Sequence, residues 1–203
     1  MENYIVFNGQ KIELTAEQVE QLKAAQQEQA VRLGDKAPGE IAKIGEYEMI
    51  VLEHTPEGTL LIRKDLLDTM QFGESNNYDG SYADEACNEF AGEIAGIVGE
   101  DNVLPHTVDL TSDDGLKDYG EIQRRASLLT TEQYRRHVHI LDKHKPEDWW
   151  WLATAHSTTA HGNDAWVKCV APSGYFGYYR HCGYYDFGVR PFCILKSDIF
   201  VSA

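Results

Sequence analysis

The chain has 203 residues, of which 42% are hydrophobic and 11% aromatic, enough for one well-packed core with a small appendage. Acidic residues outnumber basic residues by 33 to 18, and the resulting formal charge of −15 repels phosphate backbones, so nucleic acid is not an expected partner. No apolar run is long enough to span a membrane, and the first residues lack the basic and apolar regions of a secretory signal, so we expect a protein that is cytoplasmic when made.

The first residues predict a β-hairpin. Two short β-prone runs, Tyr4–Phe7 and 10–14, flank the dipeptide Asn8-Gly9. Asn-Gly accepts the positive φ angles of a two-residue type I′ turn better than other pairs. We therefore predict that the two runs pair as antiparallel strands.

A helix is predicted directly after this hairpin. Thr15 is followed three residues later by Gln18, which makes a capping box for a helix over residues 16–32. Its apolar stripe is thin, so we favour a helix docked on its own domain or a connector over an oligomerisation handle. The polar Gly/Pro segment 34–40 then predicts a boundary between an N-terminal unit, 1–34, and a main domain, 35–203.

The next segments predict two strands followed by two helices. The strands 41–53 and Thr59–Arg63 are joined by a turn at 55–58, and residues 64–70 read as a short helix. Apolar residues recur at helical spacing over Tyr82–Val98. This order favours an α+β fold over a βαβ repeat.

Residues 103–126 are acidic and predicted to be irregular. Asp109, Asp113, Asp114 and Asp118 lie close together, and clustered carboxylates are the ligands that calcium prefers. Their order does not match an EF-hand loop, so we favour a solvated acidic loop over a calcium site.

A second helix and an aromatic strand follow. Thr130 or Thr131 caps a helix predicted to end near Leu141. The run Trp149-Trp150-Trp151 then predicts a strand, in which alternation sends the first and third rings to one face and the second to the other. At least one face should therefore be core, although the rings could also form a sugar-stacking platform.

Several segments resemble a known family. They are Trp149-Trp150-Trp151-Leu152, the segment AWVKCV at 165–170, the turn Ser173-Gly174 and Gly188-Val189-Arg190-Pro191, with the upstream runs LLIRKDLL, DLTSDDGLKDYG and SLLTTEQYR. Together they are similar to an uncharacterised domain family of Firmicutes and their phages with a C-type-lectin-like fold related to sulfatase-modifying factors. The likeness reaches back to about Gly34, so it implies a C-type-lectin-like fold for the domain 35–203.

The resemblance implies architecture more than activity. It places Arg190 in the central sheet, where we expect a structural residue that bonds nearby carbonyls or a carboxylate. Related sulfatase-modifying enzymes use a cysteine pair with a metal, but Cys182 and Cys193 do not match those positions clearly. The EPN, QPD and WND tripeptides that hold calcium and sugar in many C-type lectins do not occur.

The remaining motifs predict no catalytic, metal or cofactor site. The eight histidines and four cysteines show neither HExxH nor CxxC spacing, and there is no GxSxG elbow. His137 and His139 should point to different faces of their helix. The cysteines are expected to be reduced and partly buried, with a disulfide among Cys169, Cys182 and Cys193 left open.

The C-terminal loops are rich in tyrosine and predict a recognition surface. Residues 170–195 contain five tyrosines but no Lys, Glu, Gln, Met or Trp. Tyrosine gives a large amphipathic contact area at low conformational cost, which binding loops use. The ligand-binding candidates are His156, Asn163, Tyr175, Tyr178, Tyr179, Arg180, His181, Tyr184, Tyr185 and Asp186.

This composition also fits a hypothesis about variation. Diversity-generating retroelements randomise adenines in AAC-type codons, which yields Tyr, His, Asp, Ser and Gly but none of the five missing types. They write into the C-terminal end of C-type-lectin-fold proteins. Segments 155–164 and 175–186 would vary, while the constant positions would be Trp166, Val167, Gly174, Phe187, Gly188 and Arg190; the simpler alternative is an invariant loop surface.

We therefore expect a non-enzymatic recognition protein, encoded by a phage or prophage, that binds a protein or glycan on a bacterial surface and acts there or on the phage particle. Replacing Tyr178 or Tyr184 by alanine should cost more binding than replacing Ser157. Two alternatives are a sulfatase-modifying-factor-like metal-dependent oxidase and a structural particle component. The latter would depend on residues before Gly34 for assembly.

Overall fold

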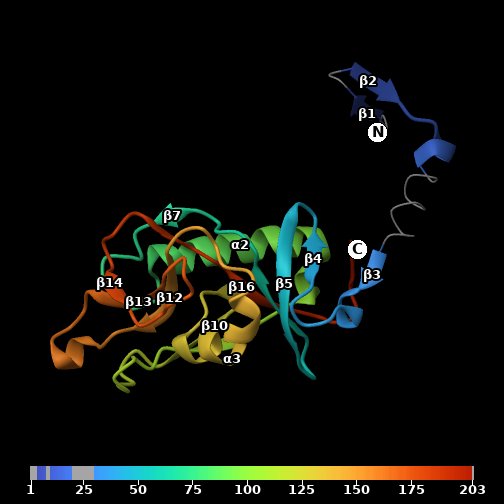
Figure 1. Cartoon of the computed structure of the whole chain (residues 1–203). Coiled ribbons are helices and arrows are strands. Elements are labelled where there is room, and N and C mark those ends of the chain that lie inside the picture. Colours follow the sequence, from blue (N-terminus) through green and yellow to red (C-terminus); the bar gives the residue numbers. More distant parts are fainter. Residues whose placement is uncertain (1–3, 8–9, 20–29, 203) are drawn as a thin grey trace.

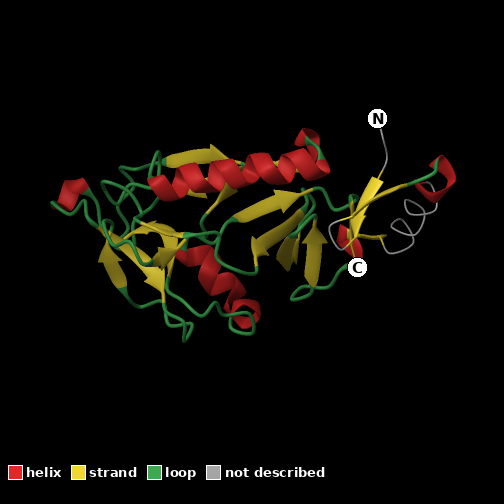
Figure 2. Ribbon diagram, turned by 90° about the horizontal axis from the view of Figure 1, so that it is seen from above, coloured by secondary structure: helices red, strands yellow, loops and turns green. Residues whose placement is uncertain are grey.

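The structure is a computed structural model that describes residues 4–7, 10–19 and 30–202 (Figure 1). It is a mixed α+β molecule, mostly strands with few helices, which confirms the predicted class. Seen from above, the long helix α2 lies along one side of the strands and α3 along the other (Figure 2). The short 3₁₀ segments are η1 (Leu33–Asp35), η2 (Glu100–Asn102) and η3 (Thr159–His161).

The larger sheet is antiparallel, curled and eight-stranded. Its order is β11-β16-β6-β5-β4-β17-β3, and β8 also pairs with β16. The first strand of the main body, β3, therefore pairs with the last, β17. The strands are β3 (Ala30–Arg32), β4 (Ile41–Ile44), β5 (Tyr47–His54), β6 (Thr59–Arg63), β8 (Val103–Leu104), β11 (Ala126–Ser127), β16 (Phe192–Leu195) and β17 (Phe200–Ser202).

The smaller sheet carries the tyrosine-rich segment. Its order is β14-β13-β12-β15-β7, so β14 is an edge strand. Only the β12–β15 pair is parallel, and the other pairs are antiparallel. The strands are β7 (Thr69–Met70), β12 (Trp150–Ala155), β13 (Trp166–Val170), β14 (Tyr179–His181) and β15 (Phe187–Gly188).

Helices α2 and α3 both begin at a side-chain cap. Helix α2 (Tyr82–Val98) matches the predicted range; the Ser81 hydroxyl caps its start, and it ends at Gly99, whose φ of 93° favours glycine. Helix α3 (Thr131–Leu141) is capped by Thr130, one of the two predicted threonines, which forms a full capping box with Gln133.

The tryptophan strand separates two core clusters. Trp150 packs with residues of β5, β6 and α3, whereas Trp151 packs with residues of α2 and β13, and Trp149 lies against this second cluster. Both Trp150 and Trp151 are buried, which confirms the predicted alternation and makes both faces of β12 core. A third cluster lies between α2 and the other face of the larger sheet.

Four predicted elements differ from the structure. Residues 16–19 are helical and show the predicted Thr15–Gln18 capping box, but residues 30–32 form β3, so the helix does not reach Arg32; residues 20–29 lie outside the described chain. The strand predicted over 41–53 is two strands, because Gly45 turns the chain with a φ of 60°.

The short helix predicted over residues 64–70 is wrong. The segment contains bends and ends in β7, because the Leu67 amide donates to Val189 and the Val189 amide donates to Asp68. These long-range bonds override the local helical pattern. The acidic segment 103–126 is irregular only in part, because the loop 110–120 lies between the paired strands β9 (His106–Asp109) and β10 (Glu121–Arg124).

The two N-terminal strands pair as predicted, while the predicted turn Asn8-Gly9 lies outside the described residues. Strands β1 (Tyr4–Phe7) and β2 (Gln10–Glu13) pair antiparallel in a sheet of their own, drawn outside the main body in Figure 1. The division at residue 34 stays a prediction, although β3 already belongs to the larger sheet. Among the described helices, none is long and apolar enough to cross a membrane.

Candidate functional site

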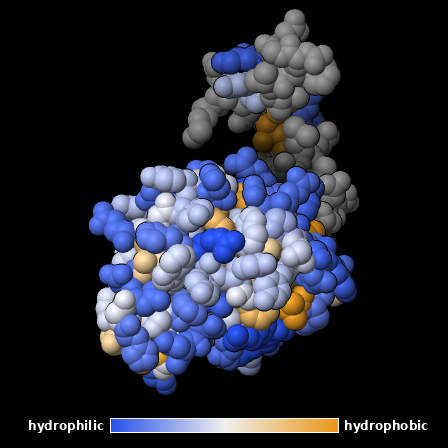
Figure 3. Space-filling view, turned by 60° about the vertical axis from the view of Figure 1, so that its left-hand side comes forward, coloured by the Kyte–Doolittle hydropathy of each residue, from blue (hydrophilic) through white to orange (hydrophobic). Residues whose placement is uncertain are grey.

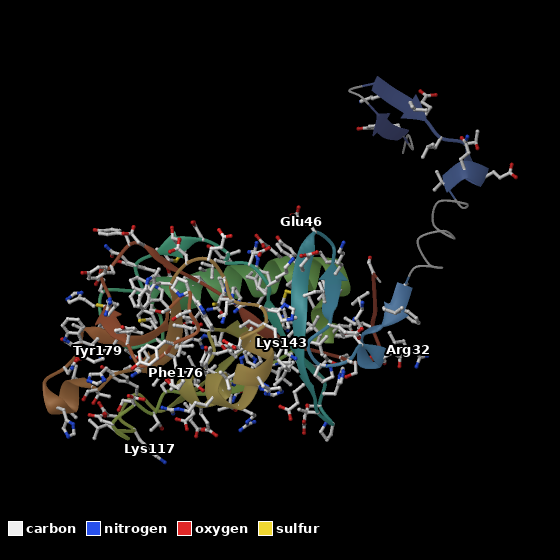
Figure 4. All side chains as sticks on the ribbon, viewed as in Figure 1. Arg32, Glu46, Lys117, Lys143, Phe176 and Tyr179 are labelled. Atoms are coloured by element: carbon white, nitrogen blue, oxygen red, sulfur yellow. The ribbon has the colours of Figure 1, made fainter. Side chains whose placement is uncertain are left out.

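The candidate surface surrounds the edge strand β14 and the turns on either side of it. The five tyrosines of this segment have exposed fractions between 41% and 69%. Figure 4 places Tyr179 at the outer end of the smaller sheet, with Phe176 between it and α3. The rings therefore face solvent and do not fill the core, as a recognition surface requires.

One group of rings lies on the face of the smaller sheet that packs against α3 near the other end of β13. Trp166 pairs with His181, and Lys168 pairs with Tyr179, so these four side chains share a face by strand alternation. The His156 ring stacks on Tyr179 with centroids 4.1 Å apart and planes 12° apart. We call this group (His156, Trp166, Tyr179 and His181) the Tyr179 face.

A second group lies on the opposite face. Arg180 pairs with the buried Val167 and therefore points away from the Tyr179 ring. Its guanidinium carbon lies 5.1 Å from the Trp149 ring centre and 5.2 Å from that of Tyr178, a cation–π arrangement. The Tyr175 ring contacts Tyr178 edge-on at 4.9 Å. We call this group (Trp149, Tyr175, Tyr178 and Arg180) the Tyr178 face.

The structure thus brings the predicted residues together around one edge, but on two faces. Tyr184 contacts Phe187, which itself contacts Trp149, so it continues the Tyr178 face. Tyr185 and Asp186 follow in the exposed turn before β15. Figure 3, which brings this end of the molecule forward, shows pale and blue atoms with small separate orange patches. Tyrosine has an intermediate hydropathy, so a surface rich in tyrosine is coloured pale on this scale.

Asn76 fixes the loop that carries His156 and Asn163. Its buried side-chain amide donates to the carbonyls of Ser157, Asn163 and Trp166, and its backbone amide donates to Asp164. Asn163 itself accepts from Ala165 and is only half-exposed. Its side chain therefore shapes the loop rather than adding to either face.

The acidic residues of the calcium alternative are engaged separately. Asp114 accepts from Ser112, Ser157 and His161, and these hydrogen bonds hold the pKa of its carboxyl well below the usual range. Asp118 accepts from Thr158 at 2.8 Å. Both carboxylates therefore lock the loop 156–163 onto the loop 112–118.

The other two carboxylates also have partners within the protein. Asp109 accepts from the amide and hydroxyl of Thr111, and Asp113 pairs with Lys168 at 3.1 Å. Among the described residues, no three His, Cys, Asp or Glu side chains converge as a metal site requires.

Arg190 is structural, as predicted. It is fully buried and donates to the carbonyls of Arg63, Lys64 and His144, with its guanidinium 5.2 Å from the Trp150 ring centre. Burial lowers its pKa to about 10, so the guanidinium stays charged at neutral pH. It ties the end of β6, the segment after α3 and the segment before β16 together.

The four cysteines are free and buried. Cys182 lies in the cluster around Trp151, whereas Cys193 lies in the cluster beneath α2. Burial raises the pKa of both thiols, to about 12 for Cys193. This arrangement does not supply the accessible thiol pair that a sulfatase-modifying chemistry needs.

Sequence reasoning left three contributors to this surface out of the ligand-binding candidates. Trp149 entered only through the sugar-stacking alternative and Trp166 only as a constant position, yet Trp166 is 38% exposed and its ring meets that of Tyr179 edge-on. The alternation of Trp166 and Lys168 with buried Val167 was the available signal. Asn76 lies in a segment, NNYDGS, whose composition indicates only a loop.

His137 and His139 point to different sides of α3, since the first is buried and the second exposed, as predicted.

We find no match to this chain among known protein families, curated proteins or solved structures.

Proposed function

We propose that this chain is a non-enzymatic recognition protein that binds a protein or glycan on a bacterial surface through the rings around β14. The observation that carries the proposal is the exposure of all five tyrosines of residues 175–185 on a rigid frame. Large exposed aromatic side chains that cluster with an arginine are the residue types of binding hot spots.

The frame under these rings supports the proposal because it is preorganised. Trp150 and Trp151 are buried in β12, two strands from β14 in the same sheet, and Arg190 lies against Trp150. Asn76 holds the loop 156–166 in place. Side chains on such a frame lose little conformational freedom on binding, which preserves affinity.

The edge of β14 favours recognition by side chains over strand addition. The carbonyl of Tyr179 accepts from the Arg180 guanidinium, and the carbonyl of His181 accepts from the amide of Tyr184. These bonds occupy acceptors that an added strand would need. Specificity would therefore reside in the rings.

The proposal includes a C-type-lectin-like frame and a phage or prophage origin, with segments 155–164 and 175–186 varied between copies. The division between buried and exposed positions supports the variation of these segments: of the predicted constant positions Val167, Phe187, Gly188 and Arg190 are buried, although Trp166 is exposed, while most of 175–186 is exposed. Within the segments, Ala155, Ser157, Thr158 and Cys182 are buried, so these four should stay fixed. Sequencing sibling copies tests this part: unchanged codons at every exposed position would overturn it.

A binding screen tests the main proposal. Labelled full-length protein is incubated with intact bacteria, with protease-treated bacteria and with periodate-oxidised bacteria. We expect saturable binding that one of the two treatments abolishes, which also assigns the ligand as protein or glycan. Absence of saturable binding across a broad panel of cells would contradict the proposal.

A further inference from the structure

A polar cavity lies at the N-terminus of α3, and none of the candidate recognition residues line it. Its volume is about 260 Å³, the size of a small metabolite. Residues of the loop 109–117, of β12 and of α3 surround it: Asp109, Thr111, Ser112, Asp113, Lys117, Thr130, Thr131, Glu132, Arg135 and Thr154.

One wall of the cavity carries an unpaired hydroxyl. Thr131 is 3% exposed, and its Oγ1 has no hydrogen-bond partner in the part of the chain that the structure describes. A buried polar group without a partner keeps its desolvation penalty, so such groups are rare in folded proteins. A ligand in the cavity would supply the missing partner.

Two further donors lie beside this hydroxyl. Thr154 Oγ1 accepts from the Thr131 amide at 2.9 Å, which leaves its own O–H uncommitted among the described residues. The backbone amide of Glu132, in the first turn of α3, donates to no described acceptor, while its carboxylate turns toward Arg136. Two hydroxyls and a helix N-terminus together form a receptor for a small carboxylate.

The other wall carries charges of both signs. Asp109 uses only its Oδ1 to accept from Thr111, so its Oδ2 is open to a donor. Asp113 is balanced by Lys168 at 3.1 Å and Arg135 at 3.7 Å. The lining carries three carboxylates, of Asp109, Asp113 and Glu132, and two cations, of Lys117 and Arg135. A free anion therefore meets a net negative wall, whereas a ligand that also carries a positive group is matched on both sides.

We propose that this cavity binds a small zwitterion of the α-amino acid class, with its carboxylate at Thr131, Thr154 and the Glu132 amide and its ammonium facing Asp109. The proposal is independent of the ligand bound by the β14 rings. A zwitterion also avoids the repulsion that the protein's formal charge of −15 imposes on free anions.

The test is a thermal-shift titration of the full chain with each common amino acid in both D and L forms. A bound amino acid at ten times its Kd should raise Tm by about 3–6 °C. Acetate and methylammonium, which each carry one of the two charges, and the corresponding amino acid amide should give no comparable shift. A shift with acetate equal to that of the amino acid would overturn the zwitterion assignment.

Thr131→Val is the matched variant, because it preserves shape and removes only the hydroxyl. Without ligand, the variant should be as stable as the parent or more stable, since the unpaired group is gone. With ligand, its rise in Tm should be at most half that of the parent. Asp109→Asn should weaken the shift similarly, while Thr107→Val, on the exposed side of β9, should leave it unchanged. An undiminished shift in Thr131→Val, or no shift with any amino acid, would overturn the proposal.

Discussion

Tyr119 donates a 2.7 Å hydrogen bond to the side-chain oxygen of Asn76, and this bond orients the amide group of Asn76 toward the carbonyls of the loop 156–166. Both residues lie outside the tyrosine-rich segment, yet they decide where His156 stands beside Tyr179. The position of the Tyr179 face therefore depends on a buried polar contact from a distant part of the chain.

Asn76→Asp should destabilise the protein by about 3 kcal/mol, because it replaces a donor by a buried charge that faces several carbonyls. Urea unfolding measures the change. Asn77→Asp is the control, since it keeps the oxygen that accepts from the Asp79 amide. Equal stability of the two variants would show that the clamp does not operate.

Arg190→Met should cost about 3 kcal/mol or more, because the carbonyls of Arg63, Lys64 and His144 lose their donor while the apolar volume stays similar. Arg190→Lys should rescue only part of this loss, since an ammonium lacks the planar fork that reaches several acceptors. Arg136→Ala, at an exposed position, should be nearly neutral. Full rescue by lysine would contradict the role assigned to the guanidinium.

His106 should make stability depend on pH. Burial lowers its pKa from 6.5 to about 4, so it folds as a neutral ring that bonds Ser127 at 2.8 Å. As pH falls from about 6.5 toward 4, the unfolded chain takes up a proton that the folded chain does not, so stability falls, by about 3 kcal/mol in all.

The measurement is the free energy of unfolding of the parent and of His106→Gln between pH 7.5 and 4. The advantage of the parent over the variant should shrink as pH falls through this window, whereas the difference between the parent and the exposed His139→Gln variant should stay constant. A parallel pH dependence of parent and His106→Gln would rule out this residue as the cause.

The cysteines should be inert in the folded protein. Burial raises the pKa of Cys87, Cys169 and Cys193 to about 12, which leaves almost no thiolate near neutrality. Iodoacetamide at pH 8 should therefore modify all four thiols only after denaturant is added. Rapid labelling of Cys182 or Cys193 in the native protein would instead revive the oxidase alternative.

Sequence patterns predicted the elements whose signals are local. The range of α2 follows from apolar spacing, the start of α3 from a capping threonine, and the division of Trp150 from Trp151 from strand alternation. The prediction of a helix over residues 64–70 is wrong because the Leu67 amide donates to Val189, more than 100 positions away. No local sequence pattern indicates such a distant partner.

The site shows the same limit. The exposed tyrosines follow from composition, but their division between two faces depends on the register that pairs Val167 with Arg180. The cavity beside Thr131 depends on β12 bringing Thr154 to the start of α3. Register and tertiary approach are set by the whole fold, so a linear reading does not reveal them.

The most direct test of the recognition surface is an alanine series measured as Kd against the bound bacterial material. Tyr178→Ala and Tyr184→Ala should each weaken binding by roughly tenfold or more. Ser157 is buried against Asp114, so the matched control is Phe200→Ala, which removes an exposed ring from β17 of the larger sheet and should leave Kd unchanged. Unchanged affinity in both tyrosine variants, or an equal loss in Phe200→Ala, would contradict the claim that the rings around β14 bind the ligand.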